Sequence, residues 1–434
     1  PEEIKRKITI STAVAPVEWK GCKINFIDTP GYLDFVGEME SGCAAGDNIL
    51  IVVGAKEGVQ SGTQRAWEVA MEKKLPTIFF VNKVDEEHAS FDKAYQGLRE
   101  AFGKSVIPFE VPILENDEVI GSINILRDKA WYFKGDKADR NKSYDVPDNM
   151  KEVVADYKNQ IAEAIAMGDD DLMEKFFSGE PFTEAELTRG VRLGVRNGEI
   201  RPVFSGSAIN MTGIERLLDL IDKYFPTYGE QGTITVTDID KNEPVELLTD
   251  EKGDLTVQVF KTIVDPFVGR ISFIKVRSGV LSSDTTVYNP KKDKLEKISQ
   301  IFIIKGKHQT AVGKLFTGDI GAVTKLAYTQ TNDTLCEKGK NIILTGIEFP
   351  QPVLSMAIKP QTKGDEEKII SGINKLMEED PTFTITNNTE TKQTLINGQG
   401  EQHIDVIISK LKSKYGVGAV LEDPIVPYRE TIKG

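Results

Sequence analysis

The 434-residue chain is 39% hydrophobic and 28% charged, a composition typical of a globular protein, and its length predicts two to four domains. Its net charge of −13 argues against a protein coated in nucleic acid, and no apolar run approaches the ~20 residues of a membrane helix, so no membrane partner is expected. Its three cysteines lie far apart without a CxxC pair, which argues against structural zinc or disulfides and favours a cytoplasmic location.

Apolar segments alternate with helical segments in the first part of the chain. Three of them, Lys23–Asp28, Asn48–Val53 and Thr77–Val81, are predicted to be central strands of one sheet, and Arg201–Ala208 is predicted to be a later strand. A helical pattern, "GTQRAWEVAMEKK", separates the second strand from the third. This alternation predicts a doubly wound parallel α/β sheet.

The stretch from about residue 106 to residue 200 contains two helical patterns, "MKEVVADYKNQIAEAIA" and "TEAELTRGVRLGVRNG". We interpret it as an α/β insert in the first domain, which is expected to cover residues 1–228. A polar linker follows, and short segments with period-2 alternation then predict an antiparallel β-barrel over residues 251–346. The order β-α-β-β-α-β over residues 352–430 predicts a ferredoxin-like split βαβ domain.

The segment that follows each predicted strand is informative, because ligands of open parallel sheets bind beyond the carboxyl ends of the strands. The first strand ends in "DTPG", from Asp28 to Gly31. A carboxylate at this place can hold Mg²⁺ directly or through water, and a glycine backbone can approach a phosphate without obstruction. The same four residues also suit an ordinary turn, which is an equally good explanation of this motif alone.

The third strand ends in "NKVD", which contains Asn82, Lys83 and Asp85. An aspartate offers two acceptor oxygens to the two adjacent N–H donors of guanine, the lysine stem can cover the base, and the asparagine can tie the loop to its neighbours. The fourth strand ends in "GSA", where a backbone N–H of Ser207 or Ala208 could reach the guanine oxygen. Each motif alone has a bland alternative, an exposed polar loop, but their order at successive strand ends favours a guanine nucleotide site.

Upstream, "KRKITI" contains Thr9, whose hydroxyl could complete a magnesium shell and sense a γ-phosphate. No G-x-x-x-x-G-K-[ST] motif occurs in the chain, so its residues do not include the loop and lysine that usually cradle phosphates.

With these motifs the sequence resembles the translational GTPases, and among them bacterial elongation factor G. The resemblance covers nearly the whole chain through "KINFIDTPGYLDFVGEME", "TIFFVNKVD", "FKTIVDPFVGRISFIKVRSGVL" and "GQGEQHIDVIISKLKSKYGVGAVLEDPIVPYRETI". It implies a P-loop GTPase-type sheet with an insert, then a β-barrel and a ferredoxin-like domain. It also implies an internal portion of a longer protein, inactive by itself, without the family's P-loop and last two domains.

The resemblance implies a role for each matching residue. Mg²⁺ would be bound by Thr9 and Asp28, while GTP or GDP would contact Asp28, Thr29, Pro30, Gly31, Asn82, Lys83, Asp85, Ser207 and Ala208. Catalysis would involve Gly31 at the γ-phosphate and Tyr32 at the attacking water. Two residues depart from the family pattern: Lys7 replaces a glycine of the R-G-I-T run, so a different loop backbone is expected, and Tyr32 replaces the water-positioning histidine.

Two functions follow from the resemblance. The first is a monomeric, ribosome-dependent GTPase that couples GTP hydrolysis to translocation, in contact with ribosomal RNA and proteins. The second is a nucleotide-gated ribosome-binding or ribosome-protection factor with weak or vestigial hydrolysis. Tyr32 keeps both open: a phenol has a reference pKa of ~10 against ~6.5 for imidazole, so it can orient water but cannot become a cation. A divergent paralogue that still hydrolyses GTP explains Tyr32 most simply.

Overall fold

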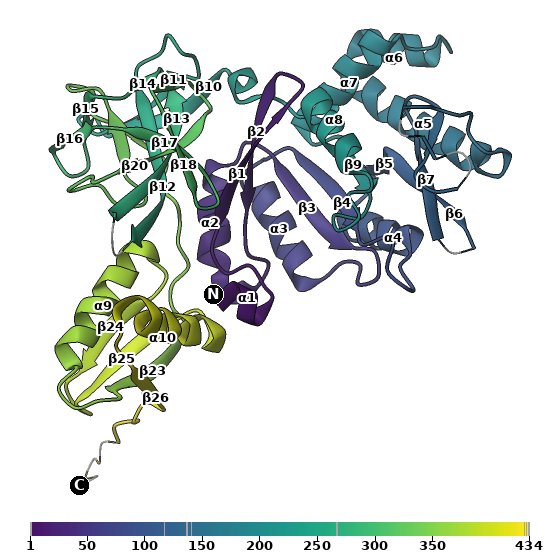
Figure 1. Ribbon diagram of the computed structural model, residues 1–434. Helices are drawn as coiled ribbons and strands as arrows, with labels where there is room; N and C mark the ends of the chain where they lie inside the picture. The colour runs from purple at the N-terminus through teal and green to yellow at the C-terminus, as the bar shows by residue number, and fades with distance from the viewer. Residues whose placement is uncertain are drawn as a thin grey trace. The chain divides into compact units, whose positions relative to one another are not determined.

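A computed structural model describes residues 2–116, 118–135, 138–139, 141–265, 268–428, 430 and 432 (Figure 1). The chain forms two compact units. The α/β unit comprises Trp19–Cys22 and Asp47–Thr227, and the barrel unit comprises Pro1–Glu18, Lys23–Gly46 and Tyr228–Gly434. The division into three domains at the predicted limits stays a prediction.

A parallel sheet of four strands forms the centre of the α/β unit. Its order is β3 (Ile49–Gly54), β4 (Thr77–Asn82), β9 (Arg201–Ser205) and β5 (Val106–Pro108), and each neighbouring pair runs parallel. The first five residues of β4 are buried, as an inner strand covered on both faces requires. Helices follow three of these strands: α3 (Ser61–Glu72), α4 (Phe91–Phe102) and α8 (Ile214–Tyr224). The predicted parallel α/β sheet is therefore confirmed.

The stretch between α4 and β9 carries a small sheet and further helices. The sheet is antiparallel, with β6 (Glu110–Glu115), β7 (Glu118–Asn124) and β8 (Lys129–Tyr132). The helical segments are η2 (Asp148–Met150), α5 (Lys151–Met167), α6 (Asp170–Phe177) and α7 (Glu184–Asn197). Thr183 and Glu186 form a capping box at the start of α7, and Gly198 ends it in the left-handed conformation. The first strand of the stretch, β5, belongs to the main parallel sheet.

The strand predicted over Lys23–Asp28 forms, but its partner differs from the prediction. β2 (Cys22–Asp28) pairs with β1 (Ala13–Trp19) in a separate two-stranded sheet. Lys20 and Gly21, both with positive φ, join the two strands, as the common two-residue hairpin turn requires. The burial of β2 is intermediate along most of its length, whereas a central parallel strand is buried on both faces.

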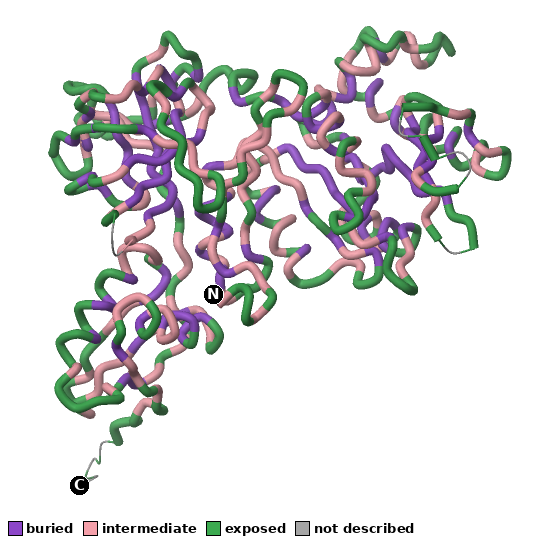
Figure 2. The backbone as a smooth tube through the Cα atoms, in the orientation of Figure 1, coloured by how far each residue is buried: buried purple, intermediate pink, exposed green. Residues whose placement is uncertain are grey.

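The barrel unit contains the predicted antiparallel β-structure. Its largest sheet has the order β16-β15-β21-β12-β13-β20-β17-β18. These strands are β12 (Thr256–Asp265), β13 (Gly269–Ser278), β15 (Thr285–Asn289), β16 (Lys294–Ile298), β17 (Ile301–Lys305), β18 (His308–Val312), β20 (Ile320–Thr324) and β21 (Thr334–Cys336). Aliphatic side chains such as Val257, Ile274 and Leu335 form its buried core. Figure 2 colours the backbone by burial, and long parts of these strands are buried.

Smaller elements complete this part of the barrel unit. A three-stranded sheet has the order β11 (Glu243–Leu248), β10 (Thr233–Asp238) and β22 (Ile342–Leu344). A two-stranded sheet joins β14 (Leu281–Ser282) to β19 (Lys314–Leu315), and η3 (Tyr228–Gln231) precedes the barrel strands.

The last part of the chain has the predicted β-α-β-β-α-β order. Its elements are β23 (Leu354–Pro360), α9 (Glu366–Glu379), β24 (Thr384–Asn388), β25 (Gln393–Gly398), α10 (Glu401–Tyr415) and β26 (Ala419–Glu422), and the sheet order is β24-β25-β23-β26. Ile373 and Ile404, one from each helix, share a fully buried core with Ile396 of the sheet. The ferredoxin-like prediction is therefore confirmed.

Three helical elements of the barrel unit flank the hairpin of β1 and β2: one precedes β1, and two follow the loop after β2. They are α1 (Glu2–Arg6), η1 (Leu33–Phe35) and α2 (Val36–Ala45). Phe35 packs with Ile10 and with Val406 of α10 in a small buried cluster. This cluster holds the loop against the ferredoxin-like part of the same unit.

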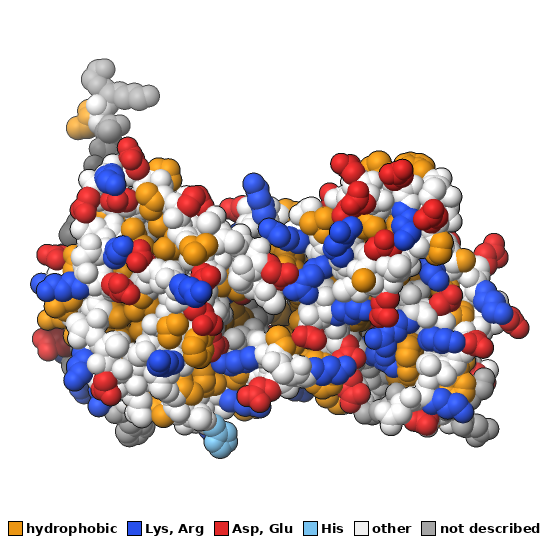
Figure 3. Space-filling view, turned by 90° about the horizontal axis from the view of Figure 1, so that it is seen from above, with side chains coloured by type: hydrophobic (Ala, Val, Ile, Leu, Met, Phe, Trp, Pro, Cys, Tyr) orange, Lys and Arg blue, Asp and Glu red, His pale blue; other side chains and the backbone are white. Residues whose placement is uncertain are grey.

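The surface carries charges of both signs. In the view of Figure 3, basic and acidic side chains are interspersed over the visible face. Among the described residues, no helix is both long enough and apolar enough to span a bilayer.

Candidate functional site

The "NKVD" and "GSA" segments are joined directly in the α/β unit. They follow β4 and β9, which are neighbours in the parallel sheet, so both leave the sheet at the same edge. The backbone N–H of Ala208 donates to Oδ1 of Asn82 at 3.0 Å. The asparagine therefore ties the two loops together, as expected. The same bond occupies the Ala208 N–H, and the Ser207 N–H donates to the Thr212 carbonyl, so both have partners within the chain.

Asp85 and Lys83 lie in the exposed part of this edge. Oδ2 of Asp85 accepts a hydrogen bond from Nδ2 of Asn210 at 2.6 Å, which holds the carboxylate in place from the other loop. Lys83 has φ of 64°, and its ammonium lies 3.3 Å from Glu86 Oε1, with 45% of the lysine side chain exposed. One loop thus carries both the Asp85 carboxylate, which Asn210 orients, and the aliphatic stem of Lys83.

Asp28 and Thr9 lie together in the barrel unit. The Thr9 hydroxyl donates to Oδ2 of Asp28 at 3.3 Å, although nineteen positions separate the two residues. Desolvation raises the pKa of Asp28, the nearby charge of Glu3 acts in the same direction, and the Thr9 hydrogen bond opposes both. The fold therefore brings these two oxygen-bearing side chains together, and their binding of Mg²⁺ stays a prediction.

Among the residues after Asp28, Gly31 is exposed and its backbone is accessible. A Cβ added at Gly31 would meet no protein atom within 4 Å, so the chain does not fill the space beside this glycine. Thr29 packs inward, because a Cβ on Gly42 of α2 would overlap its methyl group, and Pro30 is buried. Tyr32 follows with extended backbone (φ −82°, ψ 136°) and 50% of its surface exposed. Its ring is therefore available to solvent or to a ligand.

Lys7 has an unusual backbone conformation for a lysine. Its φ is 56°, in the left-handed region that glycine enters most readily. The left-handed conformation costs an L-residue such as lysine roughly 1–2 kcal/mol. The expectation that Lys7 gives this loop a different backbone from the family's stays a prediction.

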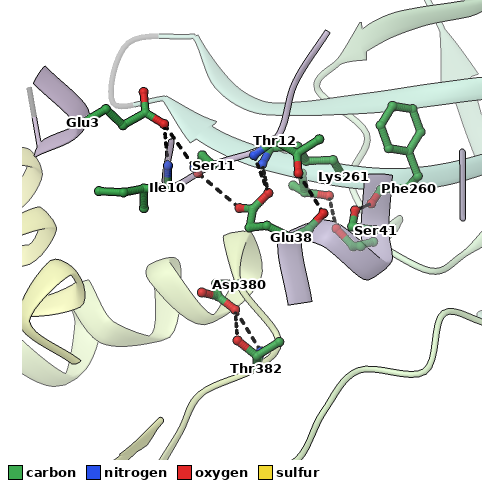
Figure 4. A network of polar contacts seen from close by, with 12 residues as sticks. Glu3, Ile10, Ser11, Thr12, Glu38, Ser41, Phe260, Lys261, Asp380 and Thr382 are labelled. Atoms are coloured by element: carbon green, nitrogen blue, oxygen red, sulfur yellow. Dashed lines mark hydrogen bonds and ion pairs between the residues drawn. The ribbon is translucent and has the colours of Figure 1, made fainter. Parts of the chain in front are cut away.

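Sequence reasoning missed three polar residues that organise these loops. Glu38 accepts hydrogen bonds from Ser11 and Thr12, and Glu3 accepts from the backbone N–H groups of Ile10 and Ser11 (Figure 4). In the α/β unit, Asn210 holds Asp85. Asn210 and Glu38 each lie a few residues beyond a recognised motif. Asn210 and Glu38 can be found in the sequence as the carboxylate or amide side chains that follow these motifs.

The oxygen atoms of Asp28 and Thr9 are too few to surround a metal ion, but they suit Mg²⁺, which also binds water and phosphate oxygens. Among the described residues, no three His, Cys, Asp or Glu side chains converge on a possible metal position. Mg²⁺ commonly uses one or two protein oxygens and completes its shell with water and substrate phosphates. A single carboxylate beside a hydroxyl, next to an unfilled backbone surface at Gly31, fits that mode of binding.

Comparisons with known proteins agree along the chain. Residues 1–227 match the family model "Elongation factor Tu GTP binding domain", residues 254–338 match "Elongation factor G domain 2", and residues 349–423 match "Elongation Factor G, domain III". The chain is 36% identical over 436 residues to an elongation factor G of Chlamydia caviae, covering 99% of this chain and 63% of the relative. It thus spans less than two thirds of that relative.

A solved structure gives the same result for the fold. A crystal structure of a protein from Thermus thermophilus matches with a TM-score of 0.88 and 29% sequence identity, over 100% of this chain and 62% of that chain. Since a model of the GTP-binding domain covers more than half of the residues and two further domain models follow it in order, the chain belongs to the elongation factor G family of translational GTPases.

Proposed function

We propose that the protein is a ribosome-dependent GTPase that couples GTP binding and hydrolysis to movement on the ribosome during protein synthesis. Family membership supports guanine nucleotide binding. The observation that carries the proposal is the hydrogen bond between Ala208 and Asn82, which joins the two strand-end loops and leaves Asp85 oriented by Asn210.

In this proposal the α/β unit recognises the base. The Asp85 carboxylate accepts the two N–H groups on the edge of guanine, and the edge of adenine lacks this pair of donors. Lys83 lays its stem along the base plane. Ser207 and Ala208 contact the guanine oxygen after a small rearrangement, because their N–H groups already have partners in the chain.

Four further residues would face the γ-phosphate. Asp28 and Thr9 would hold Mg²⁺, which supplies positive charge to the phosphate oxygens. Gly31 offers its backbone N–H, and Tyr32 orients the attacking water by a hydrogen bond. Catalysis of phosphoryl transfer is mostly positioning and electrostatics, so the ribosome acts by completing the arrangement of these groups. We place the protein in the cytoplasm as a monomer, bound to ribosomal RNA and protein.

The test uses the full-length gene product with ribosomes. We expect binding of GTP and GDP but not of adenine nucleotides, and hydrolysis of GTP that rises when ribosomes are added. Equal binding of ATP and GTP would contradict the base assignment. GTP binding without any hydrolysis on ribosomes would contradict the enzymatic part alone.

Tyr32 supports a second candidate, a nucleotide-gated factor that binds or protects the ribosome and hydrolyses GTP weakly. The tyrosine is half exposed at the place where the resemblance implies a histidine, and a phenol cannot stabilise transition-state charge as a cation. Single-turnover hydrolysis distinguishes the two candidates, because only the first requires a fast chemical step.

A further inference from the structure

One largely shielded carboxylate, that of Glu38, connects three distant segments of the barrel unit. Glu38 Oε1 accepts from the Ser11 hydroxyl at 3.1 Å, and Glu38 Oε2 accepts from the Thr12 backbone N–H at 2.8 Å. Lys261 of β12 places its ammonium 2.5 Å from the same Oε2 (Figure 4). The side chains of Glu38 and Lys261 are only 15% and 6% exposed. All hydrogen-bond partners of this carboxylate are therefore inside the protein.

The position of this carboxylate relates it to the proposed γ-phosphate residues. Ser11 and Thr12 come directly after the segment that contains Thr9, and Thr12 Oγ1 also donates to the Glu38 carbonyl at 2.7 Å. Glu38 itself lies in the first turn of α2, the helix that follows Gly31 and Tyr32. A displacement of the carboxylate would move both segments together.

The barrel fixes the other end of the same helix. The Ser41 hydroxyl donates to the Phe260 carbonyl, next to Lys261. At the C-terminus of α2, the Ala45 carbonyl accepts from Lys275 at 2.9 Å and the Ala44 carbonyl accepts from Arg277. Cations at a helix C-terminus satisfy free carbonyls and interact favourably with the helix dipole. Helix α2 is thus anchored to the barrel at both ends.

Stability alone is a weak explanation for this ion pair. Lysine is almost never fully buried unless it is paired, and the desolvation of two charges offsets much of their attraction. Well-packed apolar side chains would stabilise the contact between α2 and β12 equally well. The ion pair does one thing that an apolar contact cannot do: it fixes the position of the Glu38 carboxylate oxygens. The partners of those oxygens are the segments after Thr9.

We propose that Lys261 and Glu38 are positioning residues for GTP hydrolysis. Lys261 orients the Glu38 carboxylate, and this carboxylate holds the Ser11–Thr12 segment so that Thr9 and the loop of Tyr32 keep a reactive arrangement. The barrel thereby takes part in the reaction through an ion pair without contacting the nucleotide. This inference rests on the proposed GTPase function.

The test compares Lys261→Met and Glu38→Gln with a matched control in the full-length protein. Lys340→Met is the control, because Lys340 forms an ion pair with Asp254 in the same unit but both side chains are about half exposed. The first measurement is hydrogen–deuterium exchange of the peptide that contains Thr12. We expect faster exchange in Lys261→Met than in the parent and no change in Lys340→Met.

The second measurement is single-turnover GTP hydrolysis on ribosomes. A group misplaced by about 1 Å can cost on the order of 10²-fold in rate, so we expect Lys261→Met to lower the rate constant by up to that factor. GTP and GDP affinities should change much less than the rate, which a general loss of folding would not produce. Lys261→Arg should recover part of the rate, and the effects of Lys261→Met and Glu38→Gln should not add, because they act through one contact.

Three results would overturn the inference. The first is an unchanged rate in Lys261→Met, with or without faster exchange at Thr12. The second is an equal loss of rate and nucleotide affinity, which indicates a structural role only. The third is a parent protein that does not hydrolyse GTP on ribosomes, which would overturn the proposed function as well. A parent that hydrolyses GTP beside an unaffected Lys261→Met would contradict this inference alone.

Discussion

Asp34 caps a helix that begins 367 positions later in the chain. Its Oδ2 accepts the backbone N–H of His403, the third residue of α10, at 3.2 Å. Gly400, which precedes the helix, makes no side-chain cap of its own, and a Cβ there would overlap the Asp34 carboxylate. A helix N-terminus has unpaired N–H groups, so a carboxylate supplied by another segment stabilises it. The loop of Tyr32 and the ferredoxin-like part of the unit therefore share one hydrogen bond.

Replacement of Asp34 by alanine should weaken the start of α10. Loss of a capping side chain typically costs about 1 kcal/mol. We expect Asp34→Ala to lower the free energy of unfolding by this amount in urea denaturation. Asp405→Ala is the control, since Asp405 is exposed on the same helix. Equal stability of the two variants would show that the Asp34 cap has no energetic role.

Tyr32 should control the chemical step if it orients the attacking water. Tyr32→Phe keeps the ring and removes the hydroxyl, and loss of one preorganised donor lowers rates by roughly 10²–10³-fold. We expect such a fall in ribosome-stimulated hydrolysis with little change in GTP affinity. Leu33→Ala, a change at the neighbouring exposed residue, is the control.

Other outcomes at Tyr32 are equally informative. If the parent barely hydrolyses GTP and Tyr32→His restores hydrolysis, the nucleotide-gated function is the correct one. Fast hydrolysis in both the parent and Tyr32→Phe would show that a group other than Tyr32 orients the attacking water.

Asp85 should determine the choice of base. Asp85→Asn replaces one acceptor oxygen by a donor, which suits xanthine better than guanine. We expect GTP affinity to fall by roughly 2–5 kcal/mol, the cost of truncating a charged hydrogen-bonded pair, and XTP affinity to rise. Calorimetric titration of both nucleotides into the full-length protein measures this exchange.

Asn210 provides a graded version of the same test. Asn210→Ala removes the hydrogen bond that orients Asp85 and leaves the carboxylate in place. It should weaken GTP binding less than Asp85→Asn does, without a gain for XTP. An unchanged GTP affinity in Asp85→Asn would refute the base-reading role of this loop.

Glu110 should make the α/β unit less stable as pH rises. Burial raises the pKa of Glu110 to about 7, although a hydrogen bond from Ser122 and the charge of Arg216 oppose this shift. In the unfolded chain a glutamate ionises near pH ~4.3. The folded state therefore binds the extra proton between these two values, and the associated stability is present at low pH and lost as pH rises through about 7.

Glu110→Gln should remove this pH dependence. From pH ~4.5 to pH ~7, the unfolding free energy of the parent should fall relative to Glu110→Gln by roughly 3 kcal/mol. Urea unfolding followed by fluorescence of the nearby Trp131 measures it, and Glu115→Gln, at an exposed position of the same strand, is the control. Parallel pH profiles of the parent and Glu110→Gln would contradict the prediction.

Local patterns in the sequence determined the type and order of most elements. The alternation of strands and helices predicted β3, β4 and β9 in a parallel sheet, and the periodicity of residues 352–430 predicted the split βαβ fold. The motifs after β4 and β9 were found because side chains at the ends of parallel neighbours must share an edge. The period of each element and the residues of each motif lie close together along the chain, so a single sequence contains them.

Only the tertiary structure decided which distant groups became partners. β2 pairs with β1 instead of joining the parallel sheet, and the Ala208 N–H that could have met guanine is bound by Asn82. Glu38 and Lys261 are separated by 223 positions. Each residue has many possible partners at such separations, and the choice among them follows from the packing of the whole unit. Whether a residue is buried is decided only by that packing. The sequence alone therefore does not show that Lys261 is buried and paired with Glu38.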